Sequence, residues 1–389
     1  MTKKNNNVYL YFVLRLLEMD TNSKIRPIAL YLPQFHPIPE NDEWWGKGFT
    51  EWTNVAKAKP LFKGHHQPNL PGELGFYDLR LSEVREQQAA LAKEYGIEGF
   101  MYWRYWFAGK RLLERPFQEV LESKKPDFPF CLGWANETWS GIWHGLKDKI
   151  LMEQTYPGEK DYEAHFYDVL EAFRDPRYIT VDEKPMFCVY SPTLIPDIPL
   201  FISIWQKLAQ REGLKGIYFI GFTDNLEKNS RPLLQAGFDG IQFQRITEAT
   251  EYIIRRNFFA RLRRKLYNMG IYKHYTTKGI YEYSDYIRYI TKPTDTVENT
   301  YPAIIPNWDN SPRSGRNSLI VKNSTPELFR QHLKNVFQLL KKKSAEQRIV
   351  FIKSWNEWAE GNYMEPDSQF GRKYLEVLKE EIDNFKADE

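Results

Sequence analysis

The chain has 389 residues, of which 42% are hydrophobic and 16% are aromatic, and its formal net charge is +3. Its length and apolar content suit one large folded domain or two ordinary ones. The nearly balanced charge gives no electrostatic reason to expect a nucleic-acid partner. Two cysteines, Cys131 and Cys188, are expected to be buried free thiols, and no His/Cys spacing predicts a metal site.

Residues 1–24 are expected to form an extension that precedes the folded domain. They carry Lys3, Lys4 and an apolar stretch, 8–17, which Arg15 interrupts and which is too short to span a bilayer. No small-residue cleavage site follows, so a secretory signal is not expected. The extension is expected to be helical or to seek a membrane surface. We therefore predict a cytoplasmic protein, with peripheral contact at the inner membrane as an alternative.

Eight short apolar runs follow the extension, and each is predicted to be a buried strand. They are residues 27–33, 97–107, 128–135, 186–191, 217–222, 238–243, 301–306 and 349–354. Helices are predicted at residues 81–95, 112–124, 160–174, 200–212, 230–236, 326–343 and 374–385. Strands that alternate with helices in this way are typical of parallel βα units, and eight such units predict an α/β fold, a (β/α)8 barrel spanning residues 25–389. A doubly wound open sheet is the alternative, but no glycine-rich phosphate loop follows the first strand.

Two long segments interrupt the alternation. Residues 34–78 are predicted to form a loop that covers the domain or carries functional residues. Residues 247–300 are predicted to be an irregular basic insert with a helix at 255–265. The basic side chains are expected to form a solvated face, or alternatively to dock on an anionic membrane or on a lipid-linked or acidic glycan.

The last predicted strand leads into a segment rich in tryptophans and carboxylates. The segment 355–361, WNEWAEG, includes Glu357 and Glu360. Tryptophan faces stack on sugar rings, and carboxylates supply the acid and base of glycosidic bond cleavage. The alternative is that the tryptophans belong to the core and the acidic side chains to the solvated surface.

Catalytic residues of (β/α)8 barrels lie at the C-terminal ends of the strands, and polar and aromatic residues follow most of the predicted strands here. These residues predict a pocket for a polyhydroxylated ligand. The candidate sugar contacts are Tyr31, His36, Trp45, Glu51, Trp52, Trp103, Tyr105, Trp134, Asn136, Glu137, Trp139, Trp308, Asp309, Trp355, Asn356 and Trp358. For each of them singly, packing explains the residue type as well as ligand contact does.

Several of these segments resemble the WbsX family, which is associated with bacterial O-antigen and capsule gene clusters. The matching motifs are residues 31–36 (YLPQFH), 44–54 (WWGKGFTEWTN), 67–68 (QP), 74–80 (LGFYDLR), 134–137 (WANE) and 355–361 (WNEWAEG). The resemblance covers roughly residues 25–378. The family is often labelled glycosyltransferase and is similar to glycoside hydrolase family 99, a group of retaining endo-α-mannosidases on a (β/α)8 barrel.

The resemblance to family 99 implies that Glu357 is a catalytic base and Glu360 a catalytic acid. It further implies that the sugar's own 2-hydroxyl attacks the anomeric carbon to form a 1,2-anhydro sugar, without metal or organic cofactor. The partner implied is an oligosaccharide or polysaccharide. One alternative is a conventional acid and nucleophile pair, Glu137 with Glu357, from opposite sides of the barrel.

The reaction itself is also open to a different interpretation. A glycosyltransferase of O-antigen or capsule assembly would agree with the family label. Nucleotide-sugar transferases usually hold the diphosphate at a helix N-terminus or through a DxD motif, and the chain has neither a glycine-rich loop nor a DxD. A glycan-binding protein with an inactive site is a third hypothesis, and nothing in the sequence favours it.

Overall fold

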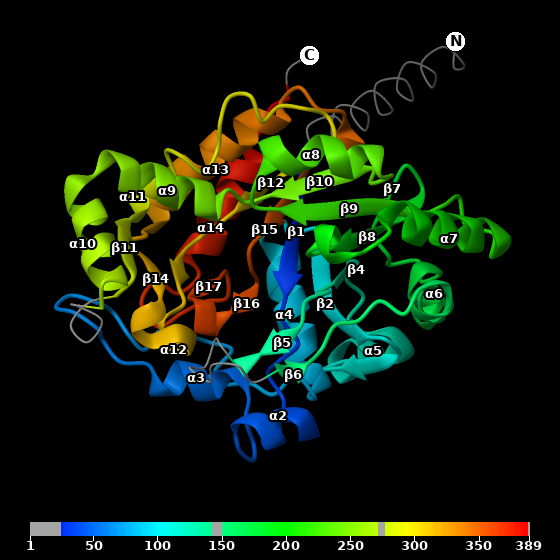
Figure 1. The fold of residues 1–389 in the computed structure, drawn as a ribbon, viewed down its shortest axis with the longest axis horizontal. Helices are drawn as coiled ribbons and strands as arrows, with labels where there is room; N and C mark the ends of the chain where they lie inside the picture. The colour runs from blue at the N-terminus through cyan, green and yellow to red at the C-terminus, as the bar shows by residue number, and fades with distance from the viewer. Residues whose placement is uncertain (1–24, 142–149, 271–276, 388–389) are drawn as a thin grey trace, which may run out of the picture.

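The structure is a computed structural model that describes residues 25–141, 150–270 and 277–387. At its centre eight parallel strands form a closed barrel (Figure 1). In order around the barrel they are β1 (Arg26–Tyr31), β2 (Gly99–Phe107), β4 (Phe130–Trp134), β8 (Lys184–Val189), β9 (Tyr218–Thr223), β10 (Gly240–Phe243), β12 (Thr300–Ile304) and β15 (Ile349–Ile352). The ring closes because β15 pairs in parallel with β1. The predicted (β/α)8 barrel is confirmed, each predicted strand overlaps one of these eight, and the closed ring excludes the open sheet.

The helices that alternate with the strands lie on the outside of the barrel (Figure 1). They are α4 (Ser82–Glu94), α5 (Arg115–Ser123), α6 (Glu159–Phe173), α7 (Ile198–Arg211), α8 (Leu226–Gln235), α13 (Pro326–Leu340) and α14 (Lys373–Asp383). In α7, Phe201, Trp205 and Leu208 form the buried stripe that a helix packed on a sheet requires. The prediction for α8 starts four residues late, because the side chain of Asn225 caps the helix by accepting from the Lys228 backbone N–H at 3.0 Å.

The loops at the C-terminal ends of the strands carry short elements of their own. They lie at the end toward which the arrow of β1 points (Figure 1). These elements are α2 (Pro39–Trp45), α3 (Glu51–Lys57), β3 (Lys110–Leu112), β5 (Trp139–Ser140), β6 (Ile150–Met152), α12 (Ser311–Ser314), β16 (Asn356–Glu357) and β17 (Asn362–Tyr363). A further short strand, β7 (Thr180–Val181), pairs with β8. The long loop after β1 is therefore a covering element with two helices.

The segment between β10 and β12 is more regular than predicted. It contains α9 (Ile246–Arg256), α10 (Phe258–Asn268), β11 (Gly279–Glu282) and α11 (Tyr283–Tyr286). In α9, apolar residues at helical spacing bury one face in a small second core. Strand β11 pairs with β14 (Leu319–Lys322), which in turn pairs with β13 (Trp308–Asp309). The insert thus packs on the loop that follows β12.

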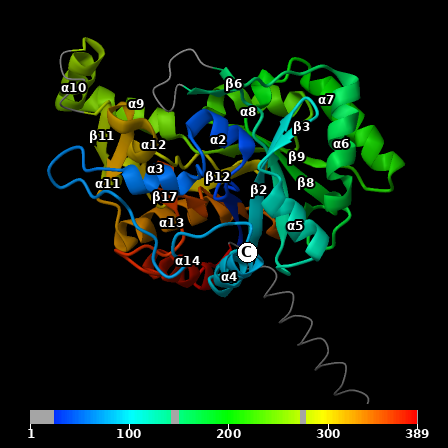
Figure 2. The same ribbon diagram turned by 90° about the horizontal axis from the view of Figure 1, so that it is seen from below.

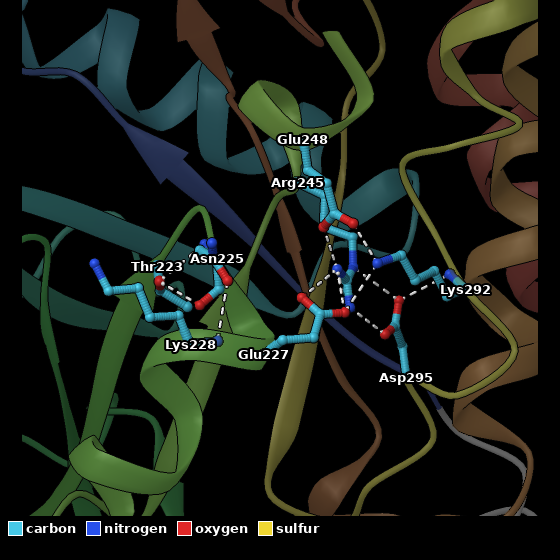
Figure 3. Close-up of polar contacts among 8 residues, drawn as sticks. All are labelled: Thr223, Asn225, Glu227, Lys228, Arg245, Glu248, Lys292 and Asp295. Atoms are coloured by element: carbon cyan, nitrogen blue, oxygen red, sulfur yellow. Dashed lines mark hydrogen bonds and ion pairs between the residues drawn. The ribbon is translucent and has the colours of Figure 1, made fainter. Parts of the chain in front are cut away.

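A buried ion network joins the two ends of the insert (Figure 3). Arg245, before α9, bonds to Asp295 through Nε at 3.1 Å and Nη2 at 2.5 Å. It also contacts Glu227 of α8 at 2.8 Å and pairs with Glu248. Lys292 contacts the same two glutamates. Since Arg245 and Asp295 are each 1% exposed, this network fixes where the insert leaves and rejoins the barrel.

Replacement of Arg245 by Met is expected to lower the free energy of unfolding by about 3 kcal/mol, because it leaves Asp295 buried without its cation. The measurement is urea unfolding at neutral pH. The matched control is Lys292→Met, since Lys292 is 37% exposed and its loss is expected to cost under about 1 kcal/mol. Equal losses in the two variants would contradict the role of Arg245 as the centre of the network.

Three further sequence-based predictions concern the cysteines, the N-terminal extension and membrane-spanning helices. Cys131 and Cys188 are buried and free, as predicted. The predictions for residues 1–24 lie outside the described residues. Within residues 25–141, 150–270 and 277–387, no helix combines the length and the apolar character needed to cross a bilayer.

Candidate active site

A cavity of about 220 Å³ lies at the C-terminal ends of the barrel strands. Its wall combines carboxylates with aromatic rings, the composition expected of a site for a polyhydroxylated ligand. The lining residues are Leu32, Gln34, Trp45, Glu51, Trp103, Tyr105, Ala135, Glu137, Thr138, Trp139, Ser140, Leu151, Tyr190, Arg313, Lys353, Glu357 and Glu360. Both glutamates of the 355–361 motif therefore reach one cavity.

Buried groups hold the turn that carries these glutamates in place. Asn356 accepts from the Leu32 backbone N–H at 2.8 Å and donates to the Leu32 carbonyl at 3.0 Å, which ties the turn to the end of β1. The Trp358 ring stacks on Tyr363 with centroids 3.8 Å apart. Its indole N–H donates to the carboxyl of Glu365 at 2.7 Å. These contacts hold Glu357 and Glu360 without using their own carboxyl oxygens.

Gly361 follows Glu360 and has a backbone conformation that favours glycine, with φ +55°. A Cβ at this position would lie 2.7 Å from the carbonyl oxygen of Asp309 and 2.8 Å from its backbone nitrogen. The loop after β12 therefore packs directly against the backbone of the turn.

We expect Gly361→Ala to destabilise the protein by about 2–3 kcal/mol, because the backbone of Asp309 leaves no room for the added methyl group. Gly371→Ala is the matched control, because Gly371 has nearly the same φ, +56°, and a Cβ added there would meet no atom of the described residues within 4 Å. The control is expected to show only the conformational cost, about 1 kcal/mol. Thermal unfolding measures the effect, and equal losses of stability in the two variants would rule out the close approach as the cause.

Arg313, on α12, joins three carboxylates of the cavity through one guanidinium group. Its Nη2 donates to Glu51 Oε1 at 2.7 Å and to Glu357 Oε1 at 2.8 Å. Its Nη1 donates to Glu360 Oε1 at 2.8 Å. Glu51 enters the cavity at the start of α3, whose first backbone N–H bonds to the carbonyl of Gln34. Three separate loops thus meet at a single cation.

The electrostatics of this cluster raise the pKa of Glu357 to about 7. Burial is the largest cause, and the charge of Glu360 adds to it, while the cation of Arg313 opposes both. Burial, together with the nearby Glu357 carboxylate, also raises the pKa of Tyr105 well above its usual value. At neutral pH Tyr105 is therefore a neutral hydroxyl, and Glu357 is close to the midpoint of its titration.

Six of the predicted sugar contacts lie on the cavity wall. They are Trp45, Glu51, Trp103, Tyr105, Glu137 and Trp139. Glu137 accepts from the Ser191 hydroxyl at 2.5 Å. Glu137 and Glu357 line the same cavity, so the geometry also allows the alternative in which these two residues form a conventional acid and nucleophile pair.

The other ten predicted contacts lie elsewhere, and eight of these ten are in the core. The eight are Tyr31, His36, Trp52, Trp134, Asn136, Trp355, Asn356 and Trp358. Three of them donate to other protein groups: Tyr31 donates to Gln88, Trp52 to the Tyr77 carbonyl, and Trp134 to the Trp106 carbonyl. His36 Nδ1 lies 3.0 Å from the Pro33 carbonyl oxygen. All eight are buried and none lines the first cavity, which agrees with packing, the alternative considered for each of them.

Trp308 and Asp309 line a second cavity, also of about 220 Å³. Asp309 Oδ2 lies 2.7 Å from both His65 Nε2 and Gln67 Nε2. Its Oδ1 accepts from the Ser311 backbone N–H at 2.9 Å, at the start of α12. Asp309 therefore supports the helix that carries Arg313 and is no part of the wall of the first cavity.

Arg313 is the most important residue that the sequence-based prediction missed. It lies four residues after Asp309 in the same loop. Candidates chosen from the whole loop, and not only from the residues directly after the strand, would have included it. Lys353 was missed because it was assigned to the predicted strand 349–354, whereas β15 ends at Ile352. In the part of the chain that the structure describes, no group of three or more His, Cys, Asp or Glu side chains could hold a metal ion.

Comparison of the fold with known structures defines the class of the protein, a barrel of the kind found in glycoside hydrolase family 99. An endo-alpha-mannosidase of that family from Bacteroides thetaiotaomicron matches with a TM-score of 0.57 and 14% sequence identity, over 92% of this chain and 97% of that chain. A protein described as glycoside hydrolase-like matches with a TM-score of 0.56 and 16% identity, over 95% of this chain and 96% of that chain. At such identities the likeness establishes the fold.

The chain belongs to the WbsX family. The sequence profile of this family, described as Glycosyltransferase WbsX, matches residues 27–378. The chain is 36% identical over 358 residues to WxcX of Xanthomonas campestris pv. campestris strain B100, described as an uncharacterized protein, and the match covers 91% of this chain and 49% of WxcX. The WxcX of strain ATCC 33913 matches to the same extent. The chain thus spans about half the length of the curated relatives it matches.

Proposed function

We propose that the chain cleaves glycosidic bonds of a bacterial surface polysaccharide with retention of configuration, using Glu357 as base and Glu360 as acid. The observation that carries the proposal is the position of these carboxylates. Both contact the guanidinium of Arg313, in a cavity walled by Trp45, Trp103 and Trp139. Tryptophan faces suit the C–H faces of sugar rings, and paired carboxylates suit proton transfer at a glycosidic bond.

The arrangement favours attack by the sugar's own 2-hydroxyl over attack by a carboxylate. A conventional retaining pair stands about 5–5.5 Å apart on opposite sides of the scissile bond. Glu357 and Glu360 are three residues apart on one turn and bind the two terminal nitrogens of one guanidinium. Both therefore approach a bound sugar from the same side of the cavity, where a base at O2 and an acid at the leaving oxygen are adjacent.

In the first step Glu357 takes the proton of the 2-hydroxyl while O2 bonds to the anomeric carbon. The bond from that carbon to the leaving oxygen breaks, and Glu360 gives its proton to this oxygen. In the second step water adds to the anomeric carbon of the 1,2-anhydro sugar and the bond from that carbon to O2 breaks. Glu360 takes a proton from the water, and Glu357 returns its proton to O2. A carboxylate whose pKa is raised to about 7 is a stronger proton acceptor than an ordinary carboxylate. The first step requires the pair of carboxyl groups to hold one proton, on Glu360, while Glu357 is ionised.

The substrate class is proposed from the family to which the chain belongs, together with the aromatic wall of the cavity. No cofactor enters either step. A location in the cytoplasm, next to the assembly of such glycans, is part of the same proposal.

Glycosyl transfer is the second candidate, and the family's own description as a glycosyltransferase favours it. The 1,2-anhydro intermediate can be opened by a sugar hydroxyl as well as by water, so transfer from one glycan to another would use the same residues. Transfer from a nucleotide sugar would instead need a site for a diphosphate. Arg313 and Lys353 are the cations on the cavity wall, and Arg313 is occupied by three carboxylates.

The test is incubation of the purified protein with the O-antigen or capsule glycan, free and lipid-linked, of the organism that encodes it. Mass spectrometry follows new reducing ends, and proton NMR follows the anomeric configuration of the first product. New reducing ends of retained configuration support the proposal. Intact glycan together with transfer from a nucleotide sugar would overturn it in favour of the transferase.

A further inference from the structure

The outer face of α10 has an unusual composition for a solvated helix. Twelve large apolar side chains are exposed among the described residues, and five of them fall within residues 252–269. Phe259 is 78% exposed, Phe258 61%, Met269 59% and Leu262 41%. The same 18 residues hold six Arg or Lys and no Asp or Glu. Apolar and basic side chains thus share one exposed surface.

Five of the six basic residues of this segment divide into two groups, and the sixth, Arg256, is exposed and donates to the Tyr252 hydroxyl at 2.6 Å. Arg263 and Arg264 turn toward the protein, where Arg263 donates to the Ile280 carbonyl at 2.6 Å and Arg264 pairs with Glu251 at 2.9 Å. Arg255, Arg261 and Lys265 are exposed. These three form no ion pair with a carboxylate of the described residues. The cations without acidic partners are therefore the ones that lie beside the exposed apolar side chains.

We propose that the outer face of α10 docks on the surface of a membrane that contains anionic lipids. The docking face comprises Phe258, Phe259, Leu262, Arg261 and Lys265 of α10, with Arg255 at the end of α9 and Met269 just after α10. A helix that enters the interface of a bilayer places apolar side chains among the acyl chains and basic ones among the headgroups. Each cation near an anionic leaflet adds to the binding. The inference goes beyond the proposed catalysis and does not depend on it.

The position of α10 agrees with such docking. It lies at the outer edge of the molecule, separated from the barrel by α9 (Figures 1 and 2). On its inner side Ala260 and Tyr267 are buried, so the helix is anchored and presents only its outer face. The ion network around Arg245 fixes the base of the insert that carries it.

Charge decides between a membrane and a second copy of this chain as the occupant. If two copies met through this face, Arg255, Arg261 and Lys265 would approach the same cations of the other copy. Like charges at an interface disfavour that association. Phosphate groups of anionic lipids instead complement these cations, and the acyl layer accommodates the two phenylalanines.

The test is sedimentation of the full chain with vesicles of phosphatidylcholine alone and of phosphatidylcholine mixed with phosphatidylglycerol. We expect at least tenfold stronger binding to the mixed vesicles, weakened by high salt. Phe258→Ser/Phe259→Ser and Arg261→Glu/Lys265→Glu are each expected to reduce binding by roughly tenfold or more. Leu194→Ser and Arg231→Glu are matched controls, because both residues are exposed and lie outside the insert.

Thermal unfolding midpoints like that of the unchanged protein show that the variants are folded, as expected for exposed positions. Equal binding to both kinds of vesicle would overturn the proposal, and so would α10 variants that bind as the unchanged chain does. Light scattering adds a further check. A dimer that dissociates in the Phe258→Ser/Phe259→Ser variant would identify the face as a contact between copies and overturn membrane docking.

Discussion

Glu357→Gln and Glu360→Gln are each expected to lower the rate of glycan cleavage by about 10⁴-fold, the upper range for loss of a positioned acid or base. In each variant an amide of the same size replaces a carboxyl, so the cavity keeps its shape. The amide can neither accept the proton of the 2-hydroxyl nor give a proton to the leaving oxygen. The measurement is the initial rate of formation of new reducing ends on the glycan that the unchanged protein cleaves.

The folding stability of Glu357→Gln separates a catalytic role from a structural one. The folded-state pKa of Glu357, about 7, lies above that of an unfolded glutamate. Glu357 therefore contributes favourably to folding stability at low pH, and this contribution is lost as the pH rises through about 7. A glutamine does not ionise and avoids this loss. We therefore expect the unfolding midpoint of Glu357→Gln above pH 7 to equal or exceed that of the unchanged protein, while activity falls.

Glu137→Gln distinguishes the two pairs of carboxylates. If the 2-hydroxyl is the nucleophile, this variant weakens substrate binding at most, since Glu137 then only contacts a sugar. A substrate without its 2-hydroxyl is also expected to resist cleavage completely. Loss of activity in Glu137→Gln equal to that in Glu357→Gln, or a covalent glycosyl adduct on either residue, would support the conventional pair instead.

The barrel could be predicted because its strands are short, continuous and apolar. Strands with both faces covered lack the alternation of half-exposed strands, and a run such as residues 349–352 is buried at every position. The insert was harder to predict. Its helices bury narrow stripes in a small core and expose apolar as well as basic residues, so the pattern between 247 and 300 did not separate into an inner and an outer face.

The candidate site could be predicted as a location more readily than as a set of residues. Strand ends identify the end of the barrel where the cavity lies, but they do not say which neighbouring side chain turns into the cavity. Gln34 lines the cavity, whereas His36, two residues later, is buried against the backbone. Likewise Glu357 reaches the cavity while the adjacent Asn356 and Trp358 support the turn from beneath. Contacts between loops decide these directions, and no local pattern records them.

Arg313 illustrates the same limit for electrostatics. Its partners lie 262, 44 and 47 residues away along the chain, so their proximity follows only from the closed barrel. With this cation in place, the two carboxylates that the proposed proton transfers require can lie close together in one cavity. Without it, the burial of Glu357 and the charge of Glu360 would both favour protonation of Glu357.

Arg313→Met is accordingly expected to reduce cleavage at neutral pH by about 10³-fold. The cation lowers the pKa of Glu357, so its removal raises that pKa further above 7 and leaves the base protonated at neutral pH. The variant is expected to recover part of its activity as the pH rises, since the base then ionises. The measurement is kcat/KM as a function of pH, whose acidic limb is expected near pH 7 in the unchanged protein and at higher pH in the variant. Because Glu357 and Glu360 interact, this limb reports the pair of carboxylates and not one of them alone.

Glu51→Gln is a control that is expected to shift the pKa of Glu357 in the opposite direction from Arg313→Met. The carboxylate of Glu51 raises the pKa of Glu357, so its replacement by an amide is expected to move the acidic limb below that of the unchanged protein. Arg313→Lys keeps the charge but loses the fork that holds separate carboxylates, and its limb is expected to lie between those of the unchanged protein and Arg313→Met. Opposite shifts in Arg313→Met and Glu51→Gln would identify the charge balance at Glu357 as the cause. Shifts of the same sign would mean that Arg313 acts through the shape of the cavity, because a purely structural role gives no reason for the two variants to differ in direction.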